Sequence, residues 1–104
     1  MPYESFRIYL RDDCYIAVEF FIVKSLVVSF VVRLVWIRSD GEEFTVARYD
    51  TAHGTAHRDI VGKTGRLLNK TWLFDMGFEK ALTYSVDDFR KHYENYIKVF
   101  CDRL

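Results

Sequence analysis

The residues best suited to chemistry lie together in one polar interval of the chain. Residues 49–65 read YDTAHGTAHRDIVGKTG and contain two of the three histidines and three of the five glycines. Histidine titrates near neutral pH, so it can serve as a general acid or base, and a neighbouring carboxylate can fix its tautomer. The interval therefore supplies four candidate catalytic residues, namely Asp50, His53, His57 and Asp59.

The same interval holds a local excess of positive charge. The whole chain has 15 basic and 15 acidic side chains, so its net charge gives no reason to expect nonspecific binding of nucleic acid or anionic membrane. Residues 48–70, however, carry five basic and two acidic side chains. A site for RNA must therefore be local, and its candidate nucleic-acid-binding residues are Arg48, Arg58 and Lys63.

Three interpretations of this interval, which we expect to be a loop, remain open. In a structural one, Asp50 caps a turn, Gly54 supplies a positive φ, and the histidines hydrogen-bond to nearby backbone. In a catalytic one, His53 and His57 act as acid and base without a metal, or contact RNA. In the third, the histidines and carboxylates hold a divalent metal. We expect no metal and no cofactor, because Gly54 loosens the segment and no cysteine or third nearby histidine completes a tetrahedral set.

Period-2 alternation of apolar residues predicts the strands that must position this interval. Four segments show it, namely residues 3–11, 16–22, 26–36 and 44–49. The last two are joined by a turn at residues 39–42, which predicts a hairpin. Residues 67–74 are either a fifth strand or part of a short helix.

The end of the chain changes to a helical period. Apolar residues recur at helical spacing from Val86 to Leu104, with charged side chains on the opposite side. Ser85 is a favourable N-cap residue, so we expect the helix to begin there. These elements predict an α+β fold, in which a C-terminal amphipathic helix packs on one face of an antiparallel meander of four to five strands. The length of 104 residues predicts a single domain, residues 1–104.

The second face of the predicted sheet suggests an interface. If the even-numbered residues of the second and third strands point to the core, six apolar side chains project from the other face, namely Tyr15, Phe21, Val27, Val31, Val35 and Ile37. An exposed apolar patch of this kind is typical of an interface. We therefore expect a homodimer, unless residues 72–82 fold back to cover this face.

Cysteine content and hydropathy bear on the compartment. Cys14 and Cys101 are the only cysteines, and without a recognisable signal peptide we expect reduced thiols and a cytoplasmic location. The apolar stretch of residues 14–37 is long enough to span a membrane, but it contains three charged side chains, which are Glu19, Lys24 and Arg33. Since each costs about 2.5–3.5 kcal/mol near a bilayer centre, we expect no membrane span.

The motif in the polar interval also carries a family resemblance. Residues 48–54, RYDTAHG, followed by His57-Arg58-Asp59, resemble the signature Y-D-x-A-H-G-x-x-H-[RK]-[DH] of small uncharacterised prokaryotic proteins. These proteins are similar to the TumE-like toxin components of toxin–antitoxin modules, and residues 81–96 resemble the terminal helix of the same group. The resemblance implies an α+β domain, an antitoxin partner, and an activity that acts on RNA or otherwise blocks translation.

Two functions of different classes follow. The first is a toxin-like protein that acts on RNA through the polar interval, with His53 and His57 as acid and base and the basic side chains holding phosphate. The second is a noncatalytic, dimeric protein-interaction domain. The sequence alone leaves open whether the protein is an enzyme.

Overall fold

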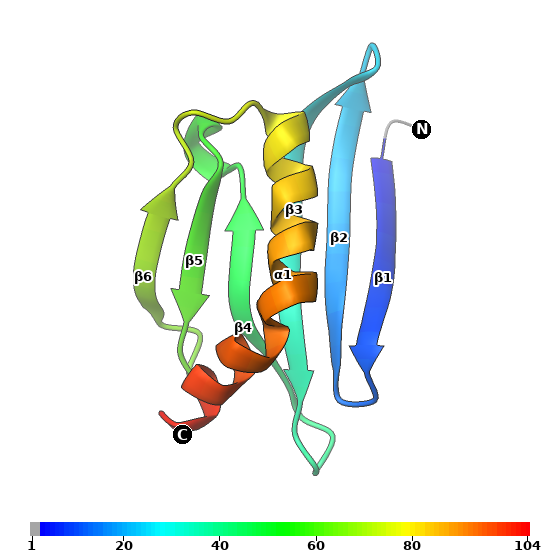
Figure 1. Ribbon diagram of the computed structural model, residues 1–104. Coiled ribbons are helices and arrows are strands. Elements are labelled where there is room, and N and C mark those ends of the chain that lie inside the picture. The colour runs from blue at the N-terminus through cyan, green and yellow to red at the C-terminus, as the bar shows by residue number, and fades with distance from the viewer. Residues whose placement is uncertain (1–2) are drawn as a thin grey trace.

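Six antiparallel strands form one sheet in which each strand pairs with its neighbours in the chain (Figure 1). The computed structural model describes residues 3–104. Its elements are β1 (Tyr3–Arg11), β2 (Cys14–Val23), β3 (Leu26–Ile37), β4 (Glu43–Asp50), a 3₁₀ turn η1 (Ala52–Gly54), β5 (His57–Val61), β6 (Leu67–Trp72) and the helix α1 (Phe78–Cys101). The predicted α+β class, with an antiparallel meander and a C-terminal helix, is confirmed.

The meander has six strands rather than the predicted four to five. Residues 67–72 form β6, which is the strand alternative for residues 67–74, and the centre of the polar interval forms β5 instead of a loop. The alternation does not predict β5 because two of its three most buried positions hold the polar residues His57 and Asp59.

The register places the even-numbered residues of β1, of β2 and of β3 from Phe30 onward on one face. Phe6 pairs with Val18, and Val18 pairs with Val32. Lys24 and Ser25, at the turn between β2 and β3, have φ angles of 50° and 67°, as a two-residue hairpin loop of matching twist requires. The hairpin predicted after it is also confirmed, since β3 pairs with β4.

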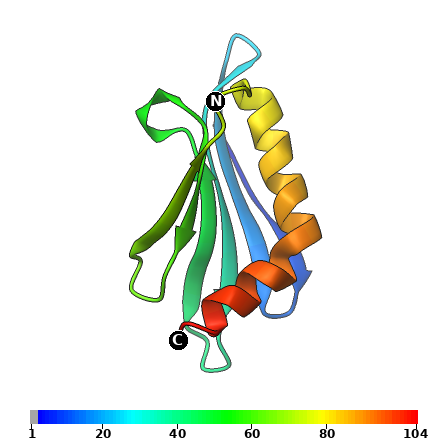
Figure 2. The same ribbon diagram turned by 60° about the vertical axis from the view of Figure 1, so that its left-hand side comes forward.

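The helix α1 covers one face of the sheet and packs mainly on β3 and β4 (Figures 1 and 2). Its buried Phe89, Ile97 and Phe100 join the main core, which also contains Val32 and Leu34 of β3. Burial of each large apolar side chain contributes about 1.5–3 kcal/mol, so this contact holds the helix on the sheet.

The helix begins earlier than predicted, at Phe78 rather than at Ser85, and Gly77 is its N-cap residue. The hydroxyl of Ser85 is buried and donates to the carbonyl oxygen of Ala81, at 2.6 Å. A serine inside a helix can satisfy its hydroxyl in this way, so the residue does not have to be a cap.

We call the sheet face opposite α1 the open face. A small second cluster on this face contains Tyr15, Ala17, Val35 and Ile37. Tyr15 is only 2% exposed because the guanidinium of Arg7 lies 4.4 Å from its ring centre and its hydroxyl donates to Glu43 at 2.6 Å. Long polar side chains, rather than a second layer, therefore cover part of the open face.

Two expectations about this face are corrected. Val27 packs against the main core, not on the open face, because the register shifts after Phe21 and Val27 then pairs with Ile22. Residues 72–82 do not form a layer over the open face either: Trp72 packs on His57 there, but Leu73 and Phe78 pack against the main core.

Two further findings concern hydropathy and the cysteines. No helix within residues 3–104 is long and apolar enough to cross a membrane. The thiols of Cys14 and Cys101 are free, the first buried and the second half-buried. Burial raises the pKa of both thiols, which lowers their reactivity at neutral pH.

Candidate functional site

The polar interval folds into the β4–β5 hairpin, whose register spreads its residues over both faces of the sheet. Asp50 pairs with His57, and Arg48 pairs with Asp59. Because side chains alternate along a strand, these four share the open face, whereas the residues between them point toward α1. One short motif therefore serves two separate sets of contacts.

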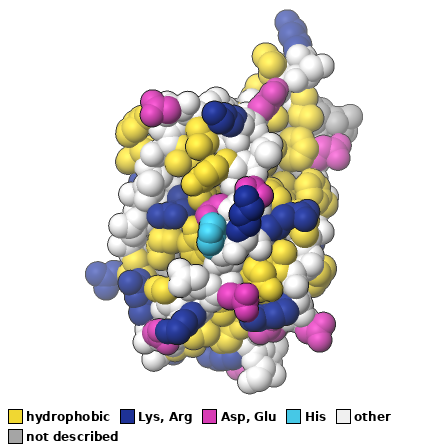
Figure 3. Space-filling model, viewed as in Figure 1, with side chains coloured by type: hydrophobic (Ala, Val, Ile, Leu, Met, Phe, Trp, Pro, Cys, Tyr) yellow, Lys and Arg dark blue, Asp and Glu magenta, His cyan; other side chains and the backbone are white. Residues whose placement is uncertain are grey.

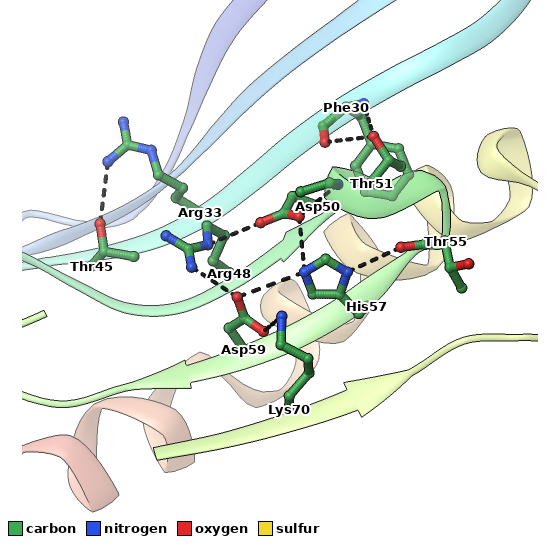
Figure 4. A network of polar contacts seen from close by, with 11 residues as sticks. Phe30, Arg33, Thr45, Arg48, Asp50, Thr51, Thr55, His57, Asp59 and Lys70 are labelled. Carbon is green, nitrogen blue, oxygen red and sulfur yellow. Dashed lines mark hydrogen bonds and ion pairs between the residues drawn. The ribbon is translucent and has the colours of Figure 1, made fainter. Parts of the chain in front are cut away.

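On the open face, the four side chains and Lys70 of β6 form what we call the ion-pair network (Figure 4). Arg48 bridges two carboxylates, with Nε 3.0 Å from Oδ2 of Asp50 and Nη2 2.8 Å from Oδ2 of Asp59. Nζ of Lys70 lies 3.1 Å from Oδ1 of Asp59. Nε2 of His57 lies 2.9 Å from Oδ1 of Asp50 and 3.7 Å from Oδ2 of Asp59. The network joins β4, β5 and β6 through side chains.

Asp50 also holds the turn that follows β4. Its Oδ1 accepts a hydrogen bond from the backbone N–H of Ala52, at 2.9 Å. His53 and Gly54 in η1 have φ angles of 70° and 82°, and the hydroxyl of Thr51 accepts a hydrogen bond from the backbone of β3 at 3.0 Å. These contacts are those expected from the structural interpretation of the interval.

His57 is 1% exposed, and both of its ring nitrogens face oxygen acceptors. Nδ1 lies 3.0 Å from the carbonyl oxygen of Thr55, and Nε2 faces Asp50. The ring also packs on Trp72, with ring centres 5.0 Å apart. Since the ring is buried and neither nitrogen is free, His57 is suited to hold the strands rather than to exchange protons with a substrate.

The electrostatics of the network centre on Asp59, whose side chain is 3% exposed. Burial alone would raise the pKa of this carboxyl group, but hydrogen bonds from Arg48 and Lys70 outweigh burial and hold the pKa below its ordinary value. Asp59 is therefore an ionised, paired carboxylate at neutral pH.

The same donors could in principle bind a metal. Asp50, His57 and Asp59 each offer one ligand atom, and these atoms lie within 4.8 Å of one another. However, Arg48 and Lys70 already bind the carboxylate oxygens, at distances between 2.8 and 3.1 Å. A metal would have to displace two cations, so the geometry favours an ion-pair network.

The other three predicted site residues lie outside the network. His53 is exposed in η1, and Lys63 is exposed in the turn between β5 and β6. Arg58 lies on the opposite face, where its Nη1 donates to the hydroxyl of Tyr96 at 3.0 Å. The geometry therefore gives no support to an acid–base pair of His53 and His57.

A second polar group, which we call the Asp88 cluster, lies on the helix side and is absent from the predicted sites. Oδ2 of Asp88 accepts hydrogen bonds from the hydroxyls of Tyr49 and Tyr96, at 2.8 and 2.5 Å. Its Oδ1 lies 2.9 Å from Nδ1 of His92, and Arg58 joins the cluster through Tyr96. The sequence signal that predicts it is the spacing of an aspartate, a histidine and a tyrosine on successive helical turns.

Burial, together with the hydrogen bonds to Asp88, raises the pKa of both tyrosines. The pKa of Tyr96 rises to about 12, and that of Tyr49 rises far above its ordinary value. Both hydroxyls are therefore protonated donors at neutral pH, and they fix the carboxylate of Asp88 in place.

The register also aligns basic side chains across the open face. From β1 to β6, the aligned positions are Arg7, Ala17, Arg33, Arg48, Asp59 and Lys70. We call the four cations among them the basic row. They lie far apart in the sequence and form no charge run, so only the strand register reveals them.

The fold and these sites define an α+β protein with an antiparallel meander, one face of which is covered by a C-terminal helix. The chain belongs to the family described as a domain of unknown function, DUF7718, whose model matches residues 1–104. No curated protein and no solved structure matches the chain.

Proposed function

We propose that this protein binds single-stranded RNA through the open face of its sheet, as a toxin-like component that acts on RNA. The observation that carries the proposal is the basic row, which crosses the sheet from Arg7 in β1 to Lys70 in β6. Arginine and lysine neutralise phosphate charge in nucleic-acid complexes and supply the salt-dependent part of the affinity. A row that crosses six strands about 4.8 Å apart can follow the backbone of a bound strand.

The cations of this face are more accessible than the carboxylates that they pair with. The side chains of Arg48 and Lys70 are 39% and 26% exposed, whereas those of Asp50 and Asp59 are 11% and 3% exposed. A polyanion that approaches the row therefore meets guanidinium and ammonium groups first. Two further carboxylates flank the row and confine the basic surface to a strip, namely those of Glu19 and Glu43.

Aromatic side chains stand at both ends of the basic row. Tyr9, in β1, is 61% exposed. Trp72, at the end of β6, is 39% exposed, and its ring stacks on Phe74 with centres 5.8 Å apart. Bases of single strands stack on exposed aromatic rings, with about 1–3 kcal/mol for each base. Basic and aromatic side chains on one sheet face thus favour a single-stranded ligand.

The residues of the motif would take different parts in this function. Asp50, His57 and Asp59 would hold the strands that carry the basic row, because they are buried and paired. His53 is the exposed histidine of the interval, so a proton transfer to RNA bound there would go through His53. We place this activity in the cytoplasm, in keeping with two free thiols.

RNA binding is tested by fluorescence anisotropy with a labelled single-stranded RNA at several salt concentrations. We expect the double variant Arg7→Gln/Arg33→Gln to bind roughly tenfold more weakly and with a smaller salt dependence. The matched control is Arg90→Gln/Lys91→Gln, which removes two exposed charges from α1. Equal loss in both double variants, or no binding by the unmodified protein at low salt, would refute the proposal.

The toxin-like part of the proposal needs a separate experiment. We expect expression of the unmodified protein to arrest growth, and the Arg7→Gln/Arg33→Gln variant to relieve the arrest. The variant His53→Asn then tests whether proton transfer is required, since the side chain is exposed and asparagine tolerates the φ of 70° at this position. If cells that express the unmodified protein grow normally although the protein binds RNA, the toxin role is refuted and the RNA-binding role remains.

A second candidate function rests on the edge strand β1. Its outer edge has no strand partner among residues 3–104. Three large side chains on this strand, those of Tyr3, Phe6 and Tyr9, are 38%, 46% and 61% exposed. An exposed edge with apolar side chains is a template for pairing with another strand. We propose that it pairs with a second copy of the chain, which would form a homodimer.

Sedimentation at micromolar concentration tests this pairing. We expect a dimer for the unmodified protein and a monomer for Phe6→Lys, which places a charge beside the edge. Phe74→Lys is the matched control, because Phe74 is also exposed but lies beyond β6. If the unmodified protein sediments as a monomer, the homodimer is excluded. If the product of an adjacent gene binds the unmodified protein but not the Phe6→Lys variant, the edge of β1 is the binding site of an antitoxin.

A further inference from the structure

A cleft lies between the C-terminal half of α1 and strands β5 and β6, on the opposite side of the sheet from the basic row. Its volume is about 610 Å³. The polar side chains that line it come from both layers and include Arg58, Asp88, His92, Asn95, Tyr96 and Arg103. Figure 3 shows that this side of the molecule carries basic and acidic side chains between apolar ones. The cleft therefore combines charged groups with partial enclosure, as ligand sites do.

His92 is the acid–base group of this cleft. Its Nδ1 lies 2.9 Å from Oδ1 of Asp88, and its side chain is 60% exposed. No hydrogen bond within residues 3–104 engages its Nε2. A carboxylate on Nδ1 orients the imidazole and leaves Nε2 available to a ligand. This is the reverse of His57, which has no free nitrogen.

The carboxylate that orients His92 is itself fixed. Tyr49 and Tyr96 donate hydrogen bonds to Oδ2 of Asp88, whose side chain is 12% exposed. Two hydroxyl donors and the imidazole ring together engage both oxygens of Asp88, and they offset its negative charge at the wall of the cleft. Asp88 therefore positions His92 without repelling an anion strongly.

Two arginines line the cleft, and their guanidinium groups favour an anionic ligand. Arg58 donates through Nη1 to Tyr96 at 3.0 Å and through Nη2 to Thr71 at 3.3 Å, and its Nε is buried without a hydrogen-bond partner among residues 3–104. Arg103 is exposed at the rim. Guanidinium groups match the geometry of phosphate oxygens, and Asn95 adds a neutral donor.

We propose that this cleft binds a phosphate ester, with Arg58 and Arg103 against the phosphate oxygens and Nε2 of His92 against the ester group. The site does not depend on RNA binding at the open face, because it uses different residues on the other side of the sheet. Inorganic phosphate, a nucleoside monophosphate and a 5′-phosphorylated oligonucleotide all carry the phosphate group, but only the last two are esters, and the experiment distinguishes the three ligands.

The experiment follows the imidazole ¹⁵N resonances of the three histidines by NMR during titration with each of the three ligands, at constant ionic strength set with chloride. We expect saturable shifts for His92 and none for His57, which is 1% exposed. The ligand with the lowest dissociation constant identifies the source of the phosphate. The Asp88→Asn variant reports the positioning role, because it should change which ring nitrogen of His92 carries the proton.

Matched variants separate the site from a general charge effect. Arg103→Gln removes an exposed cation at the rim and should raise the dissociation constant about tenfold, the size expected for one charge-assisted hydrogen bond. Lys98→Gln is the control, because it removes an exposed cation of α1 that pairs with Asp102 outside the cleft. The proposal is overturned if the phosphate ligands shift the ¹⁵N resonances of His92 no more than those of His53. It is also overturned if Arg103→Gln and Lys98→Gln weaken binding equally. RNA binding impaired by Arg7→Gln/Arg33→Gln but unaffected by Arg103→Gln would show that the two sites are separate.

Discussion

Nε2 of His57 lies 2.9 Å from Oδ1 of Asp50, and the two residues are direct cross-strand partners in β5 and β4. Cross-strand pairs stabilise a sheet, and in most sheets a buried pair is apolar. Here the buried pair is polar, and its atoms also bind Ala52, Thr55 and Arg48. The pair therefore fixes both the hairpin register and the turn that joins the strands.

Replacement of His57 by alanine should destabilise the protein strongly. The substitution leaves a cavity beside Trp72 and removes a partner from the buried Asp50, so we expect the free energy of unfolding to fall by about 3 kcal/mol. Urea denaturation measures the change. The matched control is His53→Asn, because His53 is exposed and asparagine tolerates its φ of 70°. A loss below about 1 kcal/mol for His57→Ala would contradict a structural role.

Stability should fall in acid partly through Asp59. Its pKa is lower in the folded protein than in the unfolded chain, so its carboxylate stabilises the fold at pH values above the unfolded value of about 3.9. This contribution is lost as the pH falls through the folded pKa. Asp59→Asn removes it, so the urea midpoint of the variant should depend less on pH in the acid range. Asp12→Asn, at an exposed turn residue, should keep the dependence of the unmodified protein.

Removal of one hydroxyl from the Asp88 cluster should weaken the contact between the helix and the sheet. Tyr49→Phe deletes the 2.8 Å hydrogen bond to Asp88 at a side chain that is 1% exposed. A hydrogen bond to a charged group contributes about 1.5–3 kcal/mol, and we expect a loss in this range. Tyr9→Phe, which removes an exposed hydroxyl bonded to Arg7 at 3.3 Å, should change stability by less than about 0.5 kcal/mol. Equal effects in thermal unfolding would disprove this ranking.

The ion-pair network should hold no stoichiometric metal. Arg48 and Lys70 bind the carboxylate oxygens that a metal would need, so we expect elemental analysis of the purified protein to give a ratio near zero. The double variant Arg48→Gln/Lys70→Gln exposes the donors and should gain affinity for zinc in a titration. Stoichiometric metal in the unmodified protein would instead support a metal-activated water.

Apolar alternation predicts the first four strands because their partners supply the same pattern. Val18, for example, lies between Phe6 and Val32 in the register. The alternation cannot predict β5, where charged and polar side chains replace apolar ones at buried positions. The predicted helix start at Ser85 is wrong for a different reason. A serine side chain can cap a helix from its N-terminus, but it can equally donate a hydrogen bond to a carbonyl oxygen one turn earlier inside the helix, as Ser85 does.

The site was only partly predictable from the sequence. Proximity along the chain suggests that Asp50, His57 and Asp59 lie together, and the contacts agree. Local sequence could not show that the hairpin places Arg58 on the opposite face, or that Lys70 joins from β6. The spacing of Asp88 and His92 on one side of the helix is visible in the sequence, but Tyr49, which fixes Asp88, lies 39 residues before it and is brought there only by tertiary packing.

The meander order of the sheet has a consequence for how the chain folds. Every strand pairing joins chain neighbours, whereas α1 reaches back to β3 and β4. Short loops close rapidly and at low entropic cost, so successive hairpins can form as the chain leaves the ribosome. The main core, however, lacks Phe89 and Phe100 until α1 has been synthesised. During translation the apolar face of the sheet over β3 and β4 therefore stays uncovered until α1 has been made, and a chaperone could protect it during that interval.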